Sequence, residues 1–161
     1  MLVDGTGDPR DVLARLTRWL LERPALQTIA IYAALPGEVD LSELVLRHPD
    51  RRWVFPRVQG DALAFHEVGN PETDLRPGAF GILEPSPGLP AIGCGEIDAF
   101  LCPGLAFDAR GGRLGRGRGF YDRMLATARA DALKVGVCFP GQLVADTFSE
   151  PHDVHMDVVI S

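Results

Sequence analysis

The chain has 161 residues, of which 46% are hydrophobic, 24% charged and 7% aromatic, a mix typical of a folded globular protein. A chain of this size buries enough surface to fold without disulfides or a structural metal, and we expect one domain over residues 1–161. Sixteen Lys and Arg against 22 Asp and Glu give a net charge of −6. This balance disfavours a protein that coats nucleic acid and leaves room for a local anion site only.

Cysteine content and the N-terminus bear on the compartment. The three cysteines are odd in number and form no C-x-x-C pair, which argues against a disulfide framework or a zinc knuckle and fits a reducing cytoplasm. The opening MLVDGTGDPR has acids where a signal peptide has bases, and no apolar run reaches the roughly 18–20 residues of a membrane span. We therefore expect a cytoplasmic protein without a membrane partner.

The first part of the chain predicts a helix, a buried strand and a hairpin. Apolar residues at helical spacing predict a helix that begins at a cap, Asp8 or Asp11, and ends before Pro24. Residues 27–34 are almost wholly apolar, which predicts a central strand buried on both faces. A short helix and the two strands of a hairpin follow, at residues 40–48, 52–58 and 62–68.

The second part predicts the rest of a layered fold. Residues 70–90 hold five prolines and predict an ordered loop. We expect strands at 97–102, 134–139 and 157–160, and a helix over 120–132 whose apolar residues share one face. Alternating strands and helices predict an α/β protein with three layers, in which an open, mostly parallel sheet has helices on both faces. Ligands in such folds bind beyond the carboxyl ends of the strands.

Residues 110–119, RGGRLGRGRG, contain five Gly and four Arg, a quarter of the 16 cationic side chains. The segment lies between a predicted buried strand and a predicted helix, so its backbone N–H groups can approach an anion while arginines bind phosphate oxygens. It is neither a Walker A loop nor a dinucleotide fingerprint. A flexible surface turn or an RGG-type RNA-binding segment would be the alternatives, but the flanking PGLAFD and FYD stretches favour a phosphate loop.

The stretch CPGLAFDARGGRLGRGRGFYDRML resembles the signature of the 5-formyltetrahydrofolate cyclo-ligase (methenyltetrahydrofolate synthetase) family. The segments IYAALPGEVD, WVFPRV, FGILEP and EPHDVHMDVVIS resemble further parts of the same family, so the resemblance covers most of the chain from about Gln27 onward. It implies an α/β enzyme that uses ATP and Mg²⁺ to close 5-formyltetrahydrofolate into 5,10-methenyltetrahydrofolate, releasing ADP and phosphate. Its partners would be a reduced folate and a nucleotide, with no nucleic acid.

The resemblance also implies site residues, with catalytic roles for Arg116 and Tyr121. The predicted ATP contacts are Arg113, Leu114, Gly115, Arg116, Gly117, Arg118, Gly119, Phe120 and Tyr121. The predicted folate contacts are Ala33, Glu38, Arg116, Gly117, Arg118, Gly119 and Phe120. The family usually has tyrosine where Phe120 stands, so a hydroxyl contact is lost there. Phosphoryl transfer asks a protein mainly for positioning and charge neutralisation, which such a loop can supply.

Three carboxylates complete the predicted site. The resemblance implies that Asp122 and Asp157 bind magnesium, and hard oxygen ligands suit that ion. A first-turn helix acid and a solvated strand residue are the alternatives for these two. Glu38 follows a buried strand and a Pro-Gly turn, and in the family this glutamate meets the pterin; an acid at a helix start is the alternative. Zinc at the His152–Asp157 stretch ranks below magnesium, because no third distant ligand supports it.

The start of the chain departs from the family. Members of the family begin with an additional basic helix whose side chains reach the ATP phosphates, whereas this chain opens with MLVDGTGDPR. Three explanations stay open: a start that lies upstream, a trimmed form, or a catalytically weakened paralogue that binds folate or nucleotide. An upstream start or a trimmed form is compatible with cyclo-ligase activity. A weakened paralogue would bind folate or nucleotide without that activity.

Overall fold

The computed structural model describes residues 7–161, so the N-terminal MLVDGT lies outside the described residues. Its main sheet has seven strands: β1 (Thr28–Ala30), β2 (Arg52–Gln59), β3 (Ala62–Glu67), β6 (Ala91–Ile92), β7 (Ala99–Cys102), β10 (Leu133–Val137) and β11 (Val158–Ile160). The strand order is β11-β10-β7-β1-β2-β3-β6. The first five strands in this order are parallel, and β3 and β6 are added antiparallel. The predicted mostly parallel α/β sheet is confirmed.

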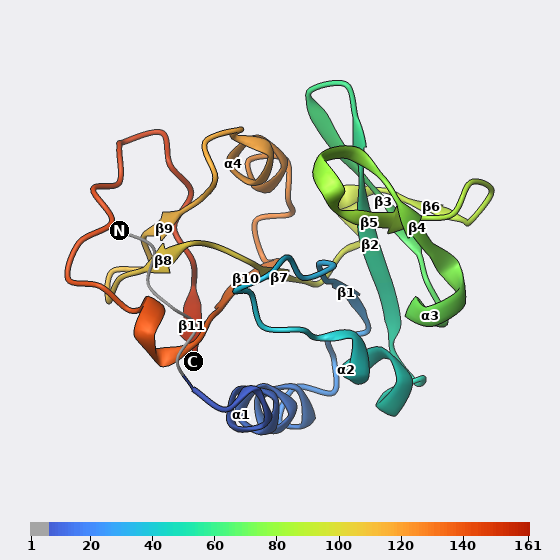
Figure 1. Ribbon diagram of the computed structural model, residues 1–161, viewed down its shortest axis with the longest axis horizontal. Coiled ribbons are helices and arrows are strands. Elements are labelled where there is room, and N and C mark those ends of the chain that lie inside the picture. The colour runs from blue at the N-terminus through green and yellow to red at the C-terminus, as the bar shows by residue number, and fades with distance from the viewer. Residues whose placement is uncertain (1–6) are drawn as a thin grey trace.

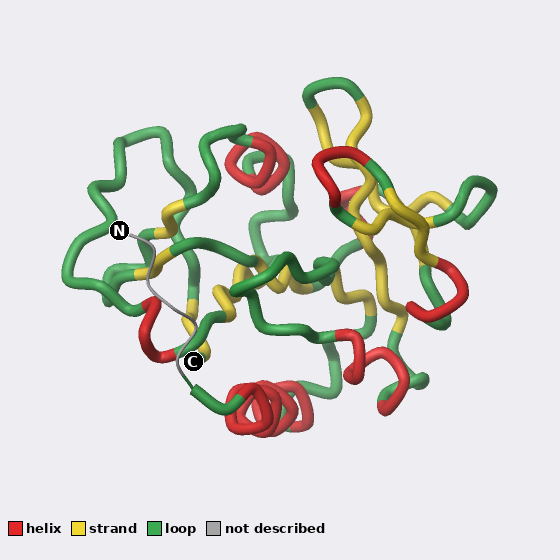
Figure 2. Tube along the Cα trace, viewed as in Figure 1, coloured by secondary structure: helices red, strands yellow, loops and turns green. Residues whose placement is uncertain are grey.

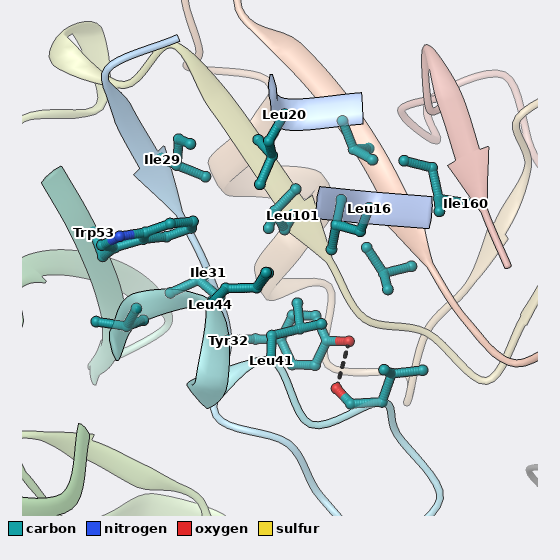
Figure 3. Close-up of a cluster of buried hydrophobic side chains, with 14 of the residues drawn as sticks. Leu16, Leu20, Ile29, Ile31, Tyr32, Leu41, Leu44, Trp53, Leu101 and Ile160 are labelled. Carbon is teal, nitrogen blue, oxygen red and sulfur yellow. Dashed lines mark hydrogen bonds between the residues drawn. The ribbon is translucent and has the colours of Figure 1, made fainter. Parts of the chain in front are cut away.

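Helices cover both faces of the sheet (Figure 1). On one face lie α1 (Pro9–Leu21) and α2 (Ser42–Arg47), and on the other lies α4 (Phe120–Leu125). α1 begins at Asp8, whose carboxylate accepts the N–H of Arg10, and its apolar stripe packs Leu16 and Leu20 toward Leu101 and neighbouring core side chains (Figure 3). Leu125 of α4 belongs to a second buried cluster on the opposite face. These layers confirm the predicted three-layer arrangement.

The connections create a crevice between two central strands. From β1 the chain passes through α2 to β2 on one side, and from β7 it passes through α4 to β10 on the other side. β1 and β7 are adjacent and parallel, with Ile29 opposite Ala99. Chains that leave neighbouring parallel strands in opposite directions open a space at the carboxyl ends of those strands. A ligand site is therefore expected beyond Ala30 and Cys102.

Two predicted elements are shorter than expected. The strand predicted at 27–34 is only β1, because after the N–H of Ile31 donates to Val54 the chain leaves the ladder, although Ile31 and Tyr32 stay buried. The helix predicted over 120–132 ends at Leu125. There the hydroxyl of Thr127 donates to the carbonyl of Met124 at 2.7 Å and competes with the helical ladder.

The loop predicted at 70–90 contains regular structure. It holds α3 (Pro71–Asp74) and a small antiparallel sheet of β4 (Leu75–Pro77) and β5 (Leu83–Pro85), joined through η1 (Ala79–Gly81). Each strand has three residues and ends in proline, so neither shows a readable alternation. The β2–β3 hairpin, by contrast, was predicted correctly.

No helix within residues 7–161 combines the length and apolar character needed to cross a bilayer. All three cysteines are free, and burial raises the pKa of Cys102 and of Cys138 to about 12. Buried thiols with raised pKa values carry little thiolate, so Cys102 and Cys138 act as small core side chains.

Candidate active site

A cavity of about 810 Å³ lies at the carboxyl ends of β1 and β7. Its lining comes from residues 32–38 after β1, Pro103 and Gly104 after β7, residues 113–122, the β2–β3 and β4–β5 hairpins, and residues 147–153, which we call the 147–153 wall. Figure 2 shows that, apart from the short η3 (Pro140–Gln142), the chain between β10 and β11 runs as loop, and this loop supplies that wall. The volume of the cavity falls within the range of small-molecule and cofactor sites.

Glu38 is a buried carboxylate at the edge of this cavity, with 7% of its side chain exposed. The Leu35-Pro36-Gly37 turn directs it inward, and Oε1 accepts the N–H of Leu35 at 2.8 Å. The chain beyond the turn is held by Tyr32, whose hydroxyl donates to the carbonyl of Val39 at 2.9 Å (Figure 3). Burial raises the pKa of Glu38, against the lowering effects of the Leu35 N–H and of Arg116. Its other oxygen, Oε2, has Arg116 at 3.7 Å, beyond hydrogen-bond distance, and is available to a donor.

The glycine- and arginine-rich segment reaches the same cavity. It begins with a short ladder between β8 (Ala106–Phe107) and β9 (Arg113–Leu114), and residues 113–119 all line the cavity. The Nη2 atom of Arg116 lies 3.7 Å from Oε2 of Glu38. Gly117 and Gly119 have φ of +89° and +70°, a left-handed backbone that other residues adopt at a cost. The structure thus brings the predicted anion loop and Glu38 together.

Arg113 and Tyr121 lie at the two ends of the loop segment that lines the cavity. Arg113 Nη1 donates to the carbonyl of Pro103 at 2.9 Å, and its guanidinium lies 5.1 Å from the centre of the Tyr121 ring. Arg113 Nε is buried without a hydrogen-bond partner among the described residues. Burial raises the pKa of Tyr121 well above that of a free phenol. Tyr121 therefore stays protonated at ordinary pH and can donate a hydrogen bond.

The two predicted metal carboxylates lie in different places. Asp122 lines the main cavity, and its Oδ1 accepts the N–H of Val154 at 3.3 Å. Asp157 lines a separate hollow, and its Oδ2 accepts the N–H of Lys134 at 2.8 Å. Among residues 7–161 no group of three or more His, Cys, Asp or Glu is arranged as a metal site. Asp122 offers a hard oxygen donor that fits Mg²⁺ together with ligand phosphates, and Asp157 is not brought to it.

Two cavity walls contain residues that the sequence interpretation did not select. Phe80, in the β4–β5 hairpin, is half exposed with φ of +59°. Its ring lies 3.6 Å from the guanidinium carbon of Arg118 and 6.2 Å from the ring of Phe120. The 147–153 wall adds further groups: Thr147, Phe148, Glu150, His152 and Asp153. The FGILEP and EPHDVHMD motifs pointed to these segments but not to the residues within them.

The fold and the site together define a class. This is an α/β protein whose ligand cavity lies at the switch point of a mostly parallel sheet, with a cationic glycine loop facing a buried carboxylate. The model of the 5-formyltetrahydrofolate cyclo-ligase family matches residues 10–161, so the chain belongs to that family.

Individual relatives agree with this assignment. A 5-formyltetrahydrofolate cyclo-ligase of Mycolicibacterium smegmatis is 48% identical over 83 residues, which cover 51% of this chain but only 43% of that relative. One of Mycoplasma pneumoniae is 29% identical over 151 residues, 91% of this chain and 80% of the relative. The solved structure of Aquifex aeolicus 5,10-methenyltetrahydrofolate synthetase has a TM-score of 0.81 at 33% identity, over 94% of this chain and 76% of that one. These relatives are named for one enzymatic activity.

Proposed function

We propose that the protein catalyses the ATP- and Mg²⁺-dependent cyclisation of 5-formyltetrahydrofolate to 5,10-methenyltetrahydrofolate. In this reaction the formyl oxygen takes the γ-phosphoryl group and ADP leaves; N10 then attacks the formyl carbon and phosphate is expelled. The observation that carries the proposal is the 3.7 Å approach of Glu38 to Arg116 within one cavity. It supports a site where a donor-rich ring and a phosphate are held side by side.

The nucleotide contacts are assigned to residues 113–121. Exposed arginines bind phosphate oxygens well because their planar forks match the oxygen geometry, and Arg116 has 44% of its side chain exposed. In the proposed reaction Arg116 neutralises charge that develops on the transferred phosphoryl group. Tyr121 donates a hydrogen bond from a phenol that stays protonated. Asp122 alone of the predicted metal pair lines this cavity, so we assign the magnesium contact to it; bound Mg²⁺ would screen the phosphate charges.

The folate contacts are assigned to the opposite wall. Oε2 of Glu38 can accept the amino and ring N–H donors of a pterin, in place of the contact with Arg116. Ala33 and Phe120 line the same space, and the Phe80 ring extends its apolar surface. The buried carboxylate orients the pterin, so that the formyl group faces the phosphate loop.

The test is formation of the methenyl product, followed by its absorbance, from 5-formyltetrahydrofolate and ATP in the presence of Mg²⁺. Product that requires both ATP and Mg²⁺, with one ADP released per product, is the expected result. A folded protein that gives no product at saturating concentrations of both substrates contradicts the proposal. If calorimetry then showed folate binding without ATP cleavage, the weakened paralogue would be the correct reading.

A further inference from the structure

Asp108 is a buried carboxylate that does not line the main cavity, with 3% of the residue exposed. It follows β8, where the chain turns into the glycine- and arginine-rich segment. Its Oδ1 accepts the N–H of Arg110 at 3.0 Å and of Gly112 at 2.9 Å. Its Oδ2 accepts the N–H of Thr147 at 2.9 Å and the Thr147 hydroxyl at 2.7 Å. Both oxygens are thus fully engaged.

The two oxygens serve two different cavity walls. Oδ1 holds Gly112, the residue immediately before Arg113, and so fixes the start of the proposed phosphate loop. Oδ2 holds Thr147, the first residue of the 147–153 wall. Burial alone would raise the pKa of Asp108, but the hydrogen bonds from Thr147, Gly112 and Arg110 outweigh it and hold the pKa well below its usual range. The carboxylate is therefore ionised at ordinary pH and can accept all four bonds.

The atoms around the Asp108 carboxylate are closely packed. A Cβ atom on Gly112 would lie 2.2 Å from the Thr147 hydroxyl oxygen and 2.5 Å from Oδ2 of Asp108. A Cβ atom on Gly111, where φ is +85°, would lie 2.3 Å from the carbonyl oxygen of Met156. Both glycines permit a close approach of the two chain segments. The Asp108 carboxylate joins these segments from a buried position, alongside the Arg110–Asp146 ion pair at 2.8 Å and the hydrogen bond from the Met156 N–H to the Gly111 carbonyl at 2.7 Å.

We propose that Asp108 is a positioning residue, which sets the spacing between the phosphate loop and the 147–153 wall by binding Gly112 with one oxygen and Thr147 with the other. The inference rests on the proposed function, since that function assigns the loop to the nucleotide. A bridge of this kind acts only through geometry, by holding the phosphate loop where it can contact the nucleotide.

The test compares Asp108→Asn with Asp98→Asn. Asparagine keeps the size of the side chain but places N–H donors opposite N–H donors on one side, so one segment is released. Asp98 is the matched control, because its Oδ2 accepts the N–H groups of Gln27 at 2.9 Å and Thr28 at 3.0 Å, and neither it nor they line the cavity. We expect both variants to lower Tm, but only Asp108→Asn to raise KM for ATP, by about tenfold, with kcat changed less than about threefold.

A second pair of variants keeps the test open if Asp108→Asn does not fold. Thr147→Val removes the hydroxyl contacts with Asp108 and with Ser149 but keeps the backbone N–H bond to Asp108. It should raise KM for ATP by about threefold, and Thr147→Ser should recover most of that loss. A wild-type KM for ATP in Asp108→Asn or in Thr147→Val overturns the proposal, because the carboxylate would then only stabilise the fold. If the wild-type protein forms no product, amide hydrogen exchange decides instead: the proposal requires faster exchange at residues 110–119 and 145–153 in Asp108→Asn and not in Asp98→Asn.

Discussion

The loops after β1 and after β8 each carry one buried acid, Glu38 and Asp108. The surroundings of these two acids shift their pKa values in opposite directions. Asp108 receives four hydrogen bonds, and its pKa is held below its usual range. Glu38 receives one close hydrogen bond, from Leu35, and burial raises its pKa. The side chains of both are less than a tenth exposed, so burial alone does not separate them. The number of hydrogen-bond donors separates them. Asp108, whose oxygens are fully hydrogen-bonded, holds the chain in place, whereas Glu38 has an oxygen available to a ligand.

The largest effect is expected from Glu38→Gln, which should lower kcat/KM for the folate by about 100-fold, since hydrogen bonds to charged groups contribute up to about 3 kcal/mol. Tm should not fall, because burial makes ionisation of this side chain unfavourable in the folded state. Steady-state kinetics and thermal unfolding check both expectations. Glu43→Gln is the matched control: Glu43 is half exposed, pairs with Arg47 at 3.0 Å on α2 and does not line the cavity. A Glu38 variant that loses stability but keeps its activity would reverse the roles of the two acids.

The next largest effect is expected from Gly112→Ala, which crowds the Asp108 bridge. The added methyl carbon would lie 2.2 Å from the Thr147 hydroxyl oxygen, so the free energy of unfolding should fall by about 2 kcal/mol. Gly95→Ala is the control, because a Cβ there meets nothing within 4 Å. Chemical denaturation measures the difference between the two variants. Equal stabilities would mean that the Asp108 bridge can open without loss of folding free energy. Asp108 would then not be the structural acid of the pair.

Much of the fold was predictable because periodic and capping patterns are local. The stripe along α1, its Asp8 cap and the β2–β3 hairpin each show in a short window of sequence. β1 was predicted too long because Ile31 and Tyr32 are buried in irregular chain, and burial on both faces looks the same with or without a ladder. The hairpin of β4 and β5 was missed because three-residue strands carry no period.

The site was predictable only where chemistry is concentrated in the sequence. Arginines and glycines at 110–119 stand out in an acidic chain, and the Pro-Gly turn marks Glu38. The EPHDVHMD motif marked the 147–153 wall only as a segment, because this wall is positioned by contacts with distant residues, among them the bridge from Thr147 to Asp108. Asp108 itself stands in the motif without a visible role, since its partners lie as far as 39 positions away in the sequence. Contacts between loops that are distant in the sequence cannot be predicted from local sequence patterns.

Arg116→Ala should lower kcat/KM by about tenfold and also change the pH dependence. Arg116 lowers the pKa of Glu38, so its removal lets that pKa rise further. If ionised Glu38 binds the folate, activity is lost as the pH falls through this pKa, and the acid limb of the pH profile should move to higher pH. Arg47→Ala, at an exposed position of α2, is the control that should leave the profile unchanged. An acid limb that stays in place would show that Glu38 does not depend on Arg116.

The smallest effect concerns Phe80, which lines the same cavity as Glu38. Its φ of +59° is a conformation that glycine adopts freely and residues with a Cβ adopt at a cost. Phe80→Gly should therefore be more stable than Phe80→Ala by about 1 kcal/mol, the reverse of the usual order for these residues. Both variants lose the ring that lies 3.6 Å from Arg118, so both should raise KM by about threefold. Urea denaturation compares the stabilities; an alanine variant more stable than the glycine variant would show that this backbone is unstrained, and the ring alone would then distinguish Phe80.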